Sequence, residues 1–312
     1  MAQGAIGGRA VTAIDLVDVV ARPDAETAAA SGPSTPPITT MVADLNQPDE
    51  VAAMVARQPD VVFHLAGVVS GEAEANLVKG YRVNLDGTRS LFDTLAVAPG
   101  RPRVVFTSSI AVFGAPFPPV IDDDFHLTPL TSYGAQKAMG ELLLADYSRR
   151  GLIDGVGIRL PTITVRPGAP NAAASGFFSS IIREPLAGAT AVLPVADTVR
   201  HPHASPQSAV ANLLHAAAID TEALGSRPNL TMPSLSVTVG EQLAALERVA
   251  GADVVALVQR GEDPAVATIV AGWPEAFAAD RARALGFVSE DTYDDIIRSY
   301  QANDAPPSTP EH

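Results

Sequence analysis

Residues 104–109 read Val-Val-Phe-Thr-Ser-Ser, and residues 132–141 read Ser-Tyr-Gly-Ala-Gln-Lys-Ala-Met-Gly-Glu. The first stretch is apolar and β-branched before it ends in hydroxyls, which is typical of a buried strand over Val104–Ser108. The second stretch opens a predicted helix over Ser132–Arg149, and another apolar run predicts a strand over Val156–Leu160. A strand, a helix and a strand in this order predict two parallel neighbouring strands with a helical crossover.

The same alternation extends on both sides of this unit. Before it, the pattern predicts strands and helices over Val11–Val20, Thr39–Ala43, Pro48–Arg57, Val61–Leu65 and Glu74–Val97. Short buried strands separated by helices indicate an α/β fold with a doubly wound, Rossmann-like parallel sheet. After Pro161 prolines interrupt the pattern, and helices are predicted over Ser175–Leu186, Pro206–Ile219 and Val239–Val249.

We therefore predict three parts along the chain. Residues 1–165 form a Rossmann domain that also receives a strand and a helix from the C-terminal half. Residues 166–302 form mainly a smaller substrate-binding cap over the carboxyl edge of the sheet, where open α/β folds bind ligands. Residues 303–312 are polar and Pro-rich and are expected to form a flexible tail.

Composition excludes several classes of protein. The 312 residues include 21 Lys and Arg against 35 Asp and Glu, which gives a net charge of −14. This charge disfavours nucleic acids and anionic membranes as partners. The chain has no cysteine, which excludes disulfides and thiolate metal sites. No apolar run approaches the ~20 residues of a membrane helix and no signal peptide is visible, so we expect a cytoplasmic protein.

Tyr133 and Lys137 are the strongest chemical signal. Their spacing of four residues places both side chains on one face of the predicted helix. An adjacent ammonium favours the phenolate form of a tyrosine, and a phenolate can take a proton from a substrate hydroxyl. A surface tyrosine and a surface lysine on a solvated helix are the plain structural alternative. Only Lys79 and Lys137 are lysines, so a chance match is uncommon.

Ser109 is the second element of this pattern, at the carboxyl end of the strand over Val104–Ser108. A serine beside the phenol can hydrogen-bond the reacting oxygen as its charge changes. Ordinary strand-end capping is the alternative for this serine alone. A strand-end serine followed by a Tyr-x-x-x-Lys helix is more specific than either part.

With these residues the chain resembles the extended short-chain dehydrogenase/reductases of the NAD-dependent epimerase/dehydratase family. The similarity runs from about Val11 onward and includes residues 107–114, 132–141, 157–163, 175–178, 200–206 and 235–240. The resemblance implies that Tyr133 is the general base, that Lys137 lowers its pKa and holds the nicotinamide ribose, and that Ser109 orients the substrate hydroxyl. It implies NAD as cofactor, bound by Asp18, Asp44, Leu45, Leu65, Ala66, Gly67, Asn84, Tyr133, Lys137, Pro161 and Thr162.

Asp18 bears on the choice between NAD and NADP. A carboxylate at the end of the first visible strand can accept hydrogen bonds from the adenosine ribose and would repel a 2′-phosphate. Arg22 lies close by in the sequence, so NADP stays open. A strand-end aspartate without a ligand is the alternative.

The family's first strand and its Gly-x-x-Gly-x-x-Gly phosphate loop have no counterpart in this sequence. Gly4, Gly7 and Gly8 have the wrong spacing and precede a strand. In register, residues 1–9 match the end of the family's first helix and Val11–Val20 match its second strand. We therefore expect a truncated form of the family's Rossmann domain.

The expected reaction is oxidation of a four-carbon sugar acid, D-erythronate, to its 2-oxo acid with NAD⁺. Arg200 is the first candidate to clamp the carboxylate and Arg183 the second, because a guanidinium can bind a carboxylate through two hydrogen bonds. A structural ion pair is the alternative for either arginine. Phe177 is a further expected substrate contact.

Two other functions stay open. One is a nucleotide-sugar epimerase or dehydratase of the same family, and the other is a catalytically impaired binding protein. His201 and His203 alternate as a metal pair would, but without a cysteine or carboxylate pattern we predict no metal site. By analogy with the family, the helices over Glu74–Val97 and Ser132–Arg149 could form a homodimer.

Overall fold

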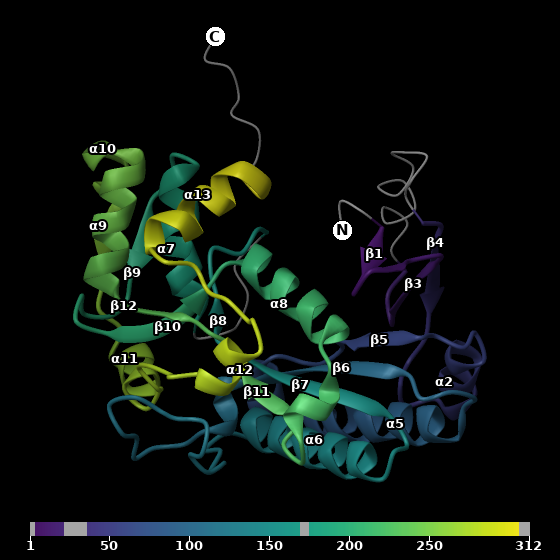
Figure 1. Ribbon diagram of the computed structural model, residues 1–312. Coiled ribbons are helices and arrows are strands. Elements are labelled where there is room, and N and C mark those ends of the chain that lie inside the picture. The colour runs from purple at the N-terminus through teal and green to yellow at the C-terminus, as the bar shows by residue number, and fades with distance from the viewer. Residues whose placement is uncertain (1–3, 22–35, 169–174, 306–312) are drawn as a thin grey trace.

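The computed structural model describes residues 4–21, 36–168 and 175–305. Its largest sheet is parallel and has the strand order β11-β7-β6-β5. The strands are β5 (Val61–His64), β6 (Arg103–Ser109), β7 (Asp154–Leu160) and β11 (Asn229–Thr231). Figure 1 shows this sheet between two helical layers, with α5 (Gly87–Val97) and α6 (Ser132–Arg149) on one face and α8 (Pro206–Ala218) on the other. The predicted doubly wound α/β fold class is confirmed.

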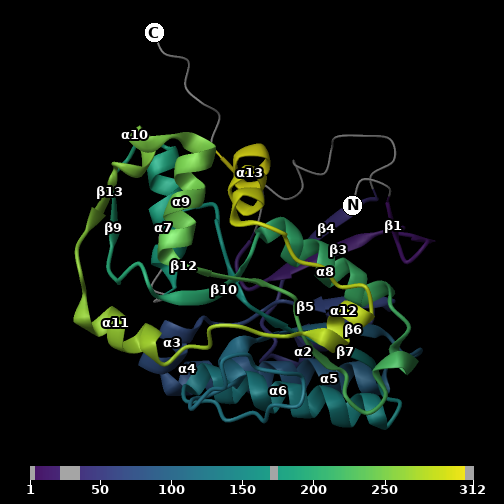
Figure 2. The same cartoon turned by 60° about the vertical axis from the view of Figure 1, so that its left-hand side comes forward.

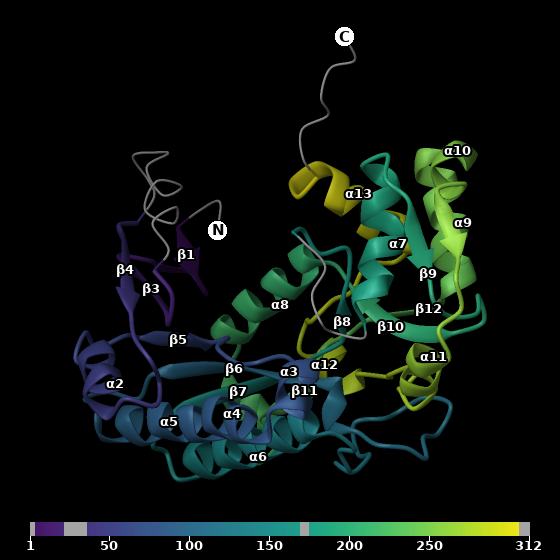
Figure 3. The same ribbon diagram turned by 180° about the vertical axis from the view of Figure 1, so that it is seen from behind.

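Two further strands form a separate parallel pair. β3 (Ile14–Asp18) pairs with β4 (Ile38–Val42), and Asp18 is the register partner of Val42. Within the described ranges no ladder joins β3 to β5, so the β3–β4 pair is separate from the main parallel sheet. Figures 1 and 3 show β3 and β4 at the end of the molecule opposite α9 (Val239–Ala250).

The first described residues form a hairpin. β1 (Ala5–Ile6) pairs with β2 (Arg9–Ala10) across Gly7 and Gly8. These glycines have φ values of +55° and +77°, and such positive values suit the tight turn of a two-residue hairpin. The prediction that residues 1–9 form the end of a helix is therefore wrong where the strands β1 and β2 lie. Residues 1–3 lie outside the described ranges.

The segment predicted as one helix over Glu74–Val97 is interrupted. It consists of α3 (Ser70–Ala75), α4 (Leu77–Tyr81), the π-helical turn η1 (Arg82–Asp86) and α5. Asn76 caps α4 by accepting a hydrogen bond from the Lys79 amide at 3.0 Å, and this cap separates α3 from α4. The prediction of one continuous helix is wrong at this point, and the π turn carries Asn84.

The C-terminal half forms a second core and also returns to the main sheet. The second core packs α7 (Gly176–Leu186), α9 and α13 (Tyr293–Asn303) together around Phe178, Leu246 and Ile296, and Figure 2 shows α7 beside α9. A three-stranded sheet lies between this core and the Rossmann sheet, in the order β12 (Leu235–Thr238), β10 (Arg200–Ala204), β8 (Thr162–Ile163). The return consists of α8, which packs on β6 and β7, and of β11, which pairs with β7.

The remaining elements complete the chain. The helices are α2 (Pro48–Val55), η2 (Ile110–Val112), α7 (Gly176–Leu186), η3 (Thr221–Leu224), α10 (Ala252–Val255), α11 (Pro264–Ala271), α12 (Asp280–Ala284) and α13 (Tyr293–Asn303). The strands are β8 (Thr162–Ile163), β9 (Ala191–Leu193), β10 (Arg200–Ala204), β12 (Leu235–Thr238) and β13 (Val258–Arg260). Most of the tail predicted over 303–312 lies outside the described residues.

No helix in the described part of the chain combines the length and the apolar character that a membrane crossing requires. The α5 and α6 helices pack together on the outer face of the main sheet (Figure 1). Leu142 of α6 is 66% exposed there. Contact of this face with a second copy of the chain stays a prediction.

Candidate active site

The N-terminal turn of α6 packs closely against the turn that follows β6. Thr131 caps the helix, because its hydroxyl accepts a hydrogen bond from the Gly134 amide at 3.1 Å. A Cβ atom on Gly134 would lie 2.1 Å from the Ala111 carbonyl oxygen, so only glycine permits this approach. The close packing brings Tyr133 to the carboxyl end of β6.

The structure brings Ser109, Tyr133 and Lys137 together. The Lys137 ammonium donates a hydrogen bond to the Thr107 carbonyl at 2.8 Å and lies 5.8 Å from the centroid of the Tyr133 ring. It also lies 5.0 Å from the centroid of the Phe106 ring. The Ser109 side chain lies close enough to the Tyr133 phenol to lower its pKa. The three side chains therefore form one cluster at the edge of the sheet where ligands bind in this fold.

Burial dominates the electrostatics of this cluster. It raises the pKa of Tyr133 above 10.0, and the Ser109 side chain opposes this shift. Burial also lowers the pKa of Lys137 to about 8. The sequence predicts that Lys137 lowers the phenol pKa, and in the structure burial outweighs such an effect. An ammonium at this distance still favours the ionised phenol over the neutral one.

Gly67 and Asn84 adjoin the same cluster. The Asn84 side chain accepts a hydrogen bond from the Val68 amide at 2.8 Å and donates one to Gln136 at 2.8 Å, so its orientation is fixed. A Cβ atom on Gly67 would lie 3.0 Å from the Asn84 oxygen and 3.7 Å from the Lys137 nitrogen. The absence of a side chain at Gly67 leaves room beside two polar groups that can face a ribose.

Leu65 and Ala66 continue the exposed edge of β5. Leu65 is 58% exposed although its side chain is apolar, and Ala66 is exposed as well. On the neighbouring side, Pro161 and Thr162 follow β7, and the Thr162 hydroxyl hydrogen-bonds the His201 ring at 2.7 Å. An apolar side chain exposed beside polar groups is typical of a surface that a ligand covers.

Asp18 and Asp44 lie at the ends of neighbouring parallel strands. Asp18 ends β3, and its carbonyl accepts a hydrogen bond from Ala43 at 3.0 Å. Asp44 accepts hydrogen bonds from Asn46, and these together with the charge of Arg82 lower its pKa. The following Leu45 packs toward α5, since a Cβ atom on Gly87 would lie 3.1 Å from the Leu45 Cβ. The Asp44 carboxylate can thus remain ionised and accept hydrogen bonds.

These residues fit a dinucleotide. Gly67 provides the open cradle, with Asn84 and Lys137 fixed beside it to hold a ribose. Asp18 and Asp44 supply acceptors at a second point on the carboxyl edge of the parallel strands. When bound, such a cofactor would accept a hydride.

Replacing Gly67 by alanine is expected to weaken nucleotide binding by about tenfold, because the added methyl would press on the Asn84 oxygen at 3.0 Å and fill the open space beside it. Calorimetric titration with NAD⁺ measures the change. The matched control is Gly272→Ala, whose added methyl meets only the Ile269 carbonyl at an ordinary 3.6 Å. Equal affinities for the two variants would remove Gly67 from the cofactor site.

The other three residues expected to bind substrate lie in the C-terminal half of the chain. The Arg200 guanidinium donates to the Ser236 carbonyl at 2.8 Å and pairs with Glu241 at 3.1 Å. Arg183 donates to the Arg166 carbonyl at 2.8 Å and pairs with Glu184. Phe177 stacks on Phe178, with ring centroids 4.1 Å apart. Clamping of a carboxylate by either arginine would require its release from these partners, and their substrate roles stay predictions.

His201 and His203 are buried in the cap and hydrogen-bonded. Burial lowers the pKa of His201 to about 3, so its ring is neutral near pH 7. The Gln242 amide lies 2.8 Å from the Nε2 atom of His203. The ring of His201 stacks on Phe178 with centroids 5.2 Å apart. No cluster of three metal-ligating side chains exists among the described residues.

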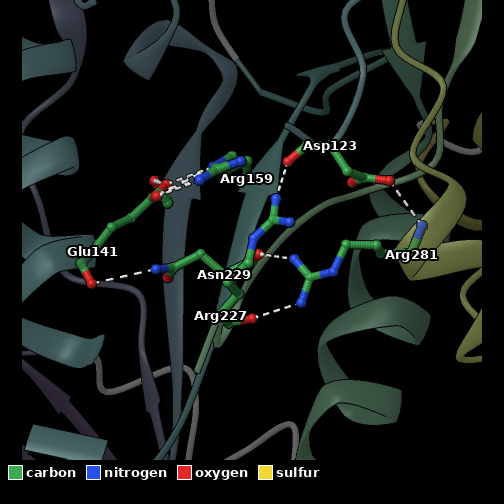
Figure 4. Close-up of polar contacts among 7 residues, drawn as sticks. Asp123, Glu141, Arg159, Arg227, Asn229 and Arg281 are labelled. Atoms are coloured by element: carbon green, nitrogen blue, oxygen red, sulfur yellow. Dashed lines mark hydrogen bonds and ion pairs between the residues drawn. The ribbon is translucent and has the colours of Figure 1, made fainter. Parts of the chain in front are cut away.

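Three polar residues behind the cluster are not among the predicted site residues. Ser108, Glu141 and Arg159 form a buried hydrogen-bonded group, and Figure 4 shows the Glu141 carboxylate facing the Arg159 fork. Glu141 lies four residues after Lys137, as Lys137 does after Tyr133. That repeated spacing places all three on one helix face and is the sequence signal that identifies Glu141.

The geometry defines a class of enzyme. A Rossmann-type fold, a nucleotide cradle and a serine–tyrosine–lysine cluster at its edge belong to a nucleotide-dependent oxidoreductase that acts on an alcohol. The chain is a member of the NAD dependent epimerase/dehydratase family, whose model matches residues 2–201. The resemblance to this family that the sequence motifs indicate is confirmed.

Individual relatives extend this likeness. A D-erythronate dehydrogenase from Cupriavidus necator is 47% identical over 291 residues, which cover 93% of this chain and 87% of that protein. A protein of the same name from Haemophilus influenzae is 39% identical over 257 residues, 82% of each chain. A crystal structure of a nucleoside-diphosphate-sugar epimerase from Agrobacterium tumefaciens has a TM-score of 0.92 at 54% identity and covers 97% of this chain and 88% of that one.

Proposed function

We propose that the protein is an NAD⁺-dependent dehydrogenase that oxidises D-erythronate to its 2-oxo acid. The observation that carries the proposal is the cluster of Ser109, Tyr133 and Lys137 beside the open Gly67 cradle. The choice of D-erythronate as the proposed substrate rests on two relatives, 47% and 39% identical, that bear the name D-erythronate dehydrogenase.

The chemistry follows from the three side chains. The ionised Tyr133 oxygen takes the proton of the C2 hydroxyl while the hydride leaves C2, so the carbon–oxygen single bond becomes a carbonyl. The Ser109 hydroxyl donates a hydrogen bond to the reacting oxygen and holds it near the phenol. The Lys137 ammonium, anchored on the Thr107 carbonyl, stabilises the phenolate and can hydrogen-bond a ribose hydroxyl.

A direct assay tests the proposal. Purified protein is mixed with NAD⁺ and D-erythronate, and NADH is followed by its absorbance. We expect stoichiometric NADH and 2-oxo acid. No NADH at any pH between 7 and 10 would contradict the proposed reaction.

The second candidate is epimerisation of a nucleotide sugar, which the name of the Agrobacterium tumefaciens relative favours. Such a reaction would interconvert UDP-glucose and its epimer without net NADH. The same protein preparation therefore separates the two candidates, since only one of them releases reduced cofactor. We expect no conversion of UDP-glucose.

NAD⁺ is proposed over NADP⁺ because the Asp18 carboxylate, at the end of β3, can accept hydrogen bonds from a ribose and would repel a 2′-phosphate. Asp18→Asn is expected to raise the ratio of kcat/KM for NADP⁺ to that for NAD⁺ by about tenfold, since a negative charge facing a 2′-phosphate is removed. The control is Asp15→Asn on the same strand, where Arg57 pairs with the carboxylate at 2.6 Å. An unchanged ratio in Asp18→Asn would exclude Asp18 from cofactor selection.

A further inference from the structure

Three residues on one face of α6 contact three consecutive residues of β6. Tyr133 lies beside Ser109, which lowers the pKa of its phenol, the Lys137 ammonium donates to the Thr107 carbonyl, and the Glu141 carboxylate accepts a hydrogen bond from Ser108 at 2.6 Å. The first two contacts belong to the reacting cluster. The third lies one helical turn behind it and fixes the helix on the strand.

Arg159 of β7 holds the Glu141 carboxylate from the other side. Its Nε atom donates to Oε1 at 2.9 Å and its Nη2 atom donates to Oε2 at 2.7 Å, which is a two-pronged ion pair. Glu141 is 1% exposed, so its charge depends on these donors. Arg159 is also the register partner of Ser108 in the neighbouring strand. One carboxylate therefore joins α6, β6 and β7 at the end where the site lies.

The contacts extend to the loop that leads into Tyr133. The Asn229 amide of β11 donates to the Glu141 carbonyl at 3.3 Å, and the Asn229 carbonyl accepts from Arg281 at 3.3 Å. The backbone amide of Arg281 donates to Asp123 at 2.8 Å, and Asp123 lies in the connection between η2 and α6. Figure 4 shows these links as a continuous chain of polar contacts across the strands.

We infer that Glu141, held by Arg159 and Ser108, is a positioning residue that sets the register of α6 on β6 and thereby the alignment of Tyr133 with Ser109 and Lys137. A helix that lost this anchor could shift along the strand while its apolar packing persisted. A displacement of about 1 Å at a reacting group can cost 10²-fold in rate. The inference deepens the proposed function and rests on it for its kinetic readout.

The kinetic test compares two ion pairs at opposite ends of β7: the pair of Arg159 with Glu141 on α6, and the half-buried pair of Asp154 with Arg103 on β6. Glu141→Gln removes the charge at the site end. The control, Asp154→Asn, removes the carboxylate that pairs with Arg103 at 2.7 Å at the opposite end of β6 and β7. We expect Glu141→Gln to lower kcat about 10- to 100-fold with KM for NAD⁺ within about threefold of wild type, and Asp154→Asn to leave both unchanged.

A second readout does not need a substrate. Absorbance titration of wild type against Tyr133→Phe isolates the ionisation of this one phenol, beside which lie Ser109 on β6 and Lys137 on α6. Glu74 of α3 is the charged group next in the chain contacts, since its carboxylate accepts a hydrogen bond from the Ser132 backbone amide at 2.9 Å. We expect the measured pKa of Tyr133 to change in Glu141→Gln and to equal the wild-type value in Asp154→Asn. If wild type made no NADH, the proposed function would fail while this titration still tested the inference.

Ser108→Ala covers the case in which Glu141→Gln does not fold. It keeps the ion pair with Arg159 and removes only the hydroxyl contact to the carboxylate. We expect a smaller fall in kcat, about three- to tenfold, in the same direction. The inference is overturned if folded Glu141→Gln or Ser108→Ala matches Asp154→Asn in kcat and in the Tyr133 titration.

Discussion

Replacing Tyr133 by phenylalanine should lower kcat for alcohol oxidation by about 10³-fold, because no other group in the cluster can take the hydroxyl proton. The ring stays in place and only the oxygen that contacts Ser109 is lost. The affinity for NAD⁺, measured by calorimetry, should change less than about threefold. Steady-state NADH production under saturating substrate provides the measurement.

The control for this prediction is Tyr147→Phe on the same helix. The Tyr147 hydroxyl donates a hydrogen bond to Asp93 on α5, and neither residue belongs to the site. Its removal should leave kcat unchanged. If Tyr133→Phe retained more than a tenth of the wild-type rate, another group would have to be the base.

Replacing Lys137 by methionine should lower kcat/KM by about 10²-fold or more. Methionine fills the buried space, but the ammonium is lost and the Thr107 carbonyl loses its donor. The rate depends on the ionised phenol and thus rises with pH. Below the Lys137 pKa of about 8, where wild type carries the ammonium, its loss removes a charge that favours the phenolate, so the deficit in kcat/KM should be largest there and shrink at higher pH. The pH dependence of kcat/KM measures both effects.

The other lysine of the chain supplies the control. Lys79 lies on α4 and pairs with Glu72 at the surface. Lys79→Met should leave both the rate and its pH dependence as in wild type. A Lys137→Met enzyme whose profile coincides with that of Lys79→Met would contradict the role assigned to the ammonium.

The central part of the fold is predictable from local patterns. The apolar runs predict β5, β6 and β7 to within about two residues, and the helix over Ser132–Arg149 matches α6 at both ends. Buried β-branched runs decide the three strands, because these strands are covered on both faces. The serine, tyrosine and lysine follow from motif spacing, and the structure brings all three together.

Other features depend on contacts between distant segments, which the sequence pattern does not reveal. The π turn that carries Asn84 sits in a segment whose pattern predicts one helix, and the backbone of Val68 fixes the Asn84 side chain. Arg200 has the residue type of a carboxylate clamp, but in the structure it pairs with Glu241. The local sequence pattern does not reveal this pair, because Glu241 lies 41 positions further along the chain. The predicted sheet is divided because β3 pairs with β4 alone.

The most direct test of the account follows the hydride. D-erythronate carrying deuterium at C2 is mixed with NAD⁺ and enzyme in a single turnover, and the mass of the reduced cofactor is measured. The account predicts reduced cofactor one mass unit heavier than normal NADH, formed in an amount equal to the 2-oxo acid, and no such product with Tyr133→Phe on the same timescale. Unlabelled reduced cofactor, or consumption of D-erythronate without reduced cofactor, would contradict it.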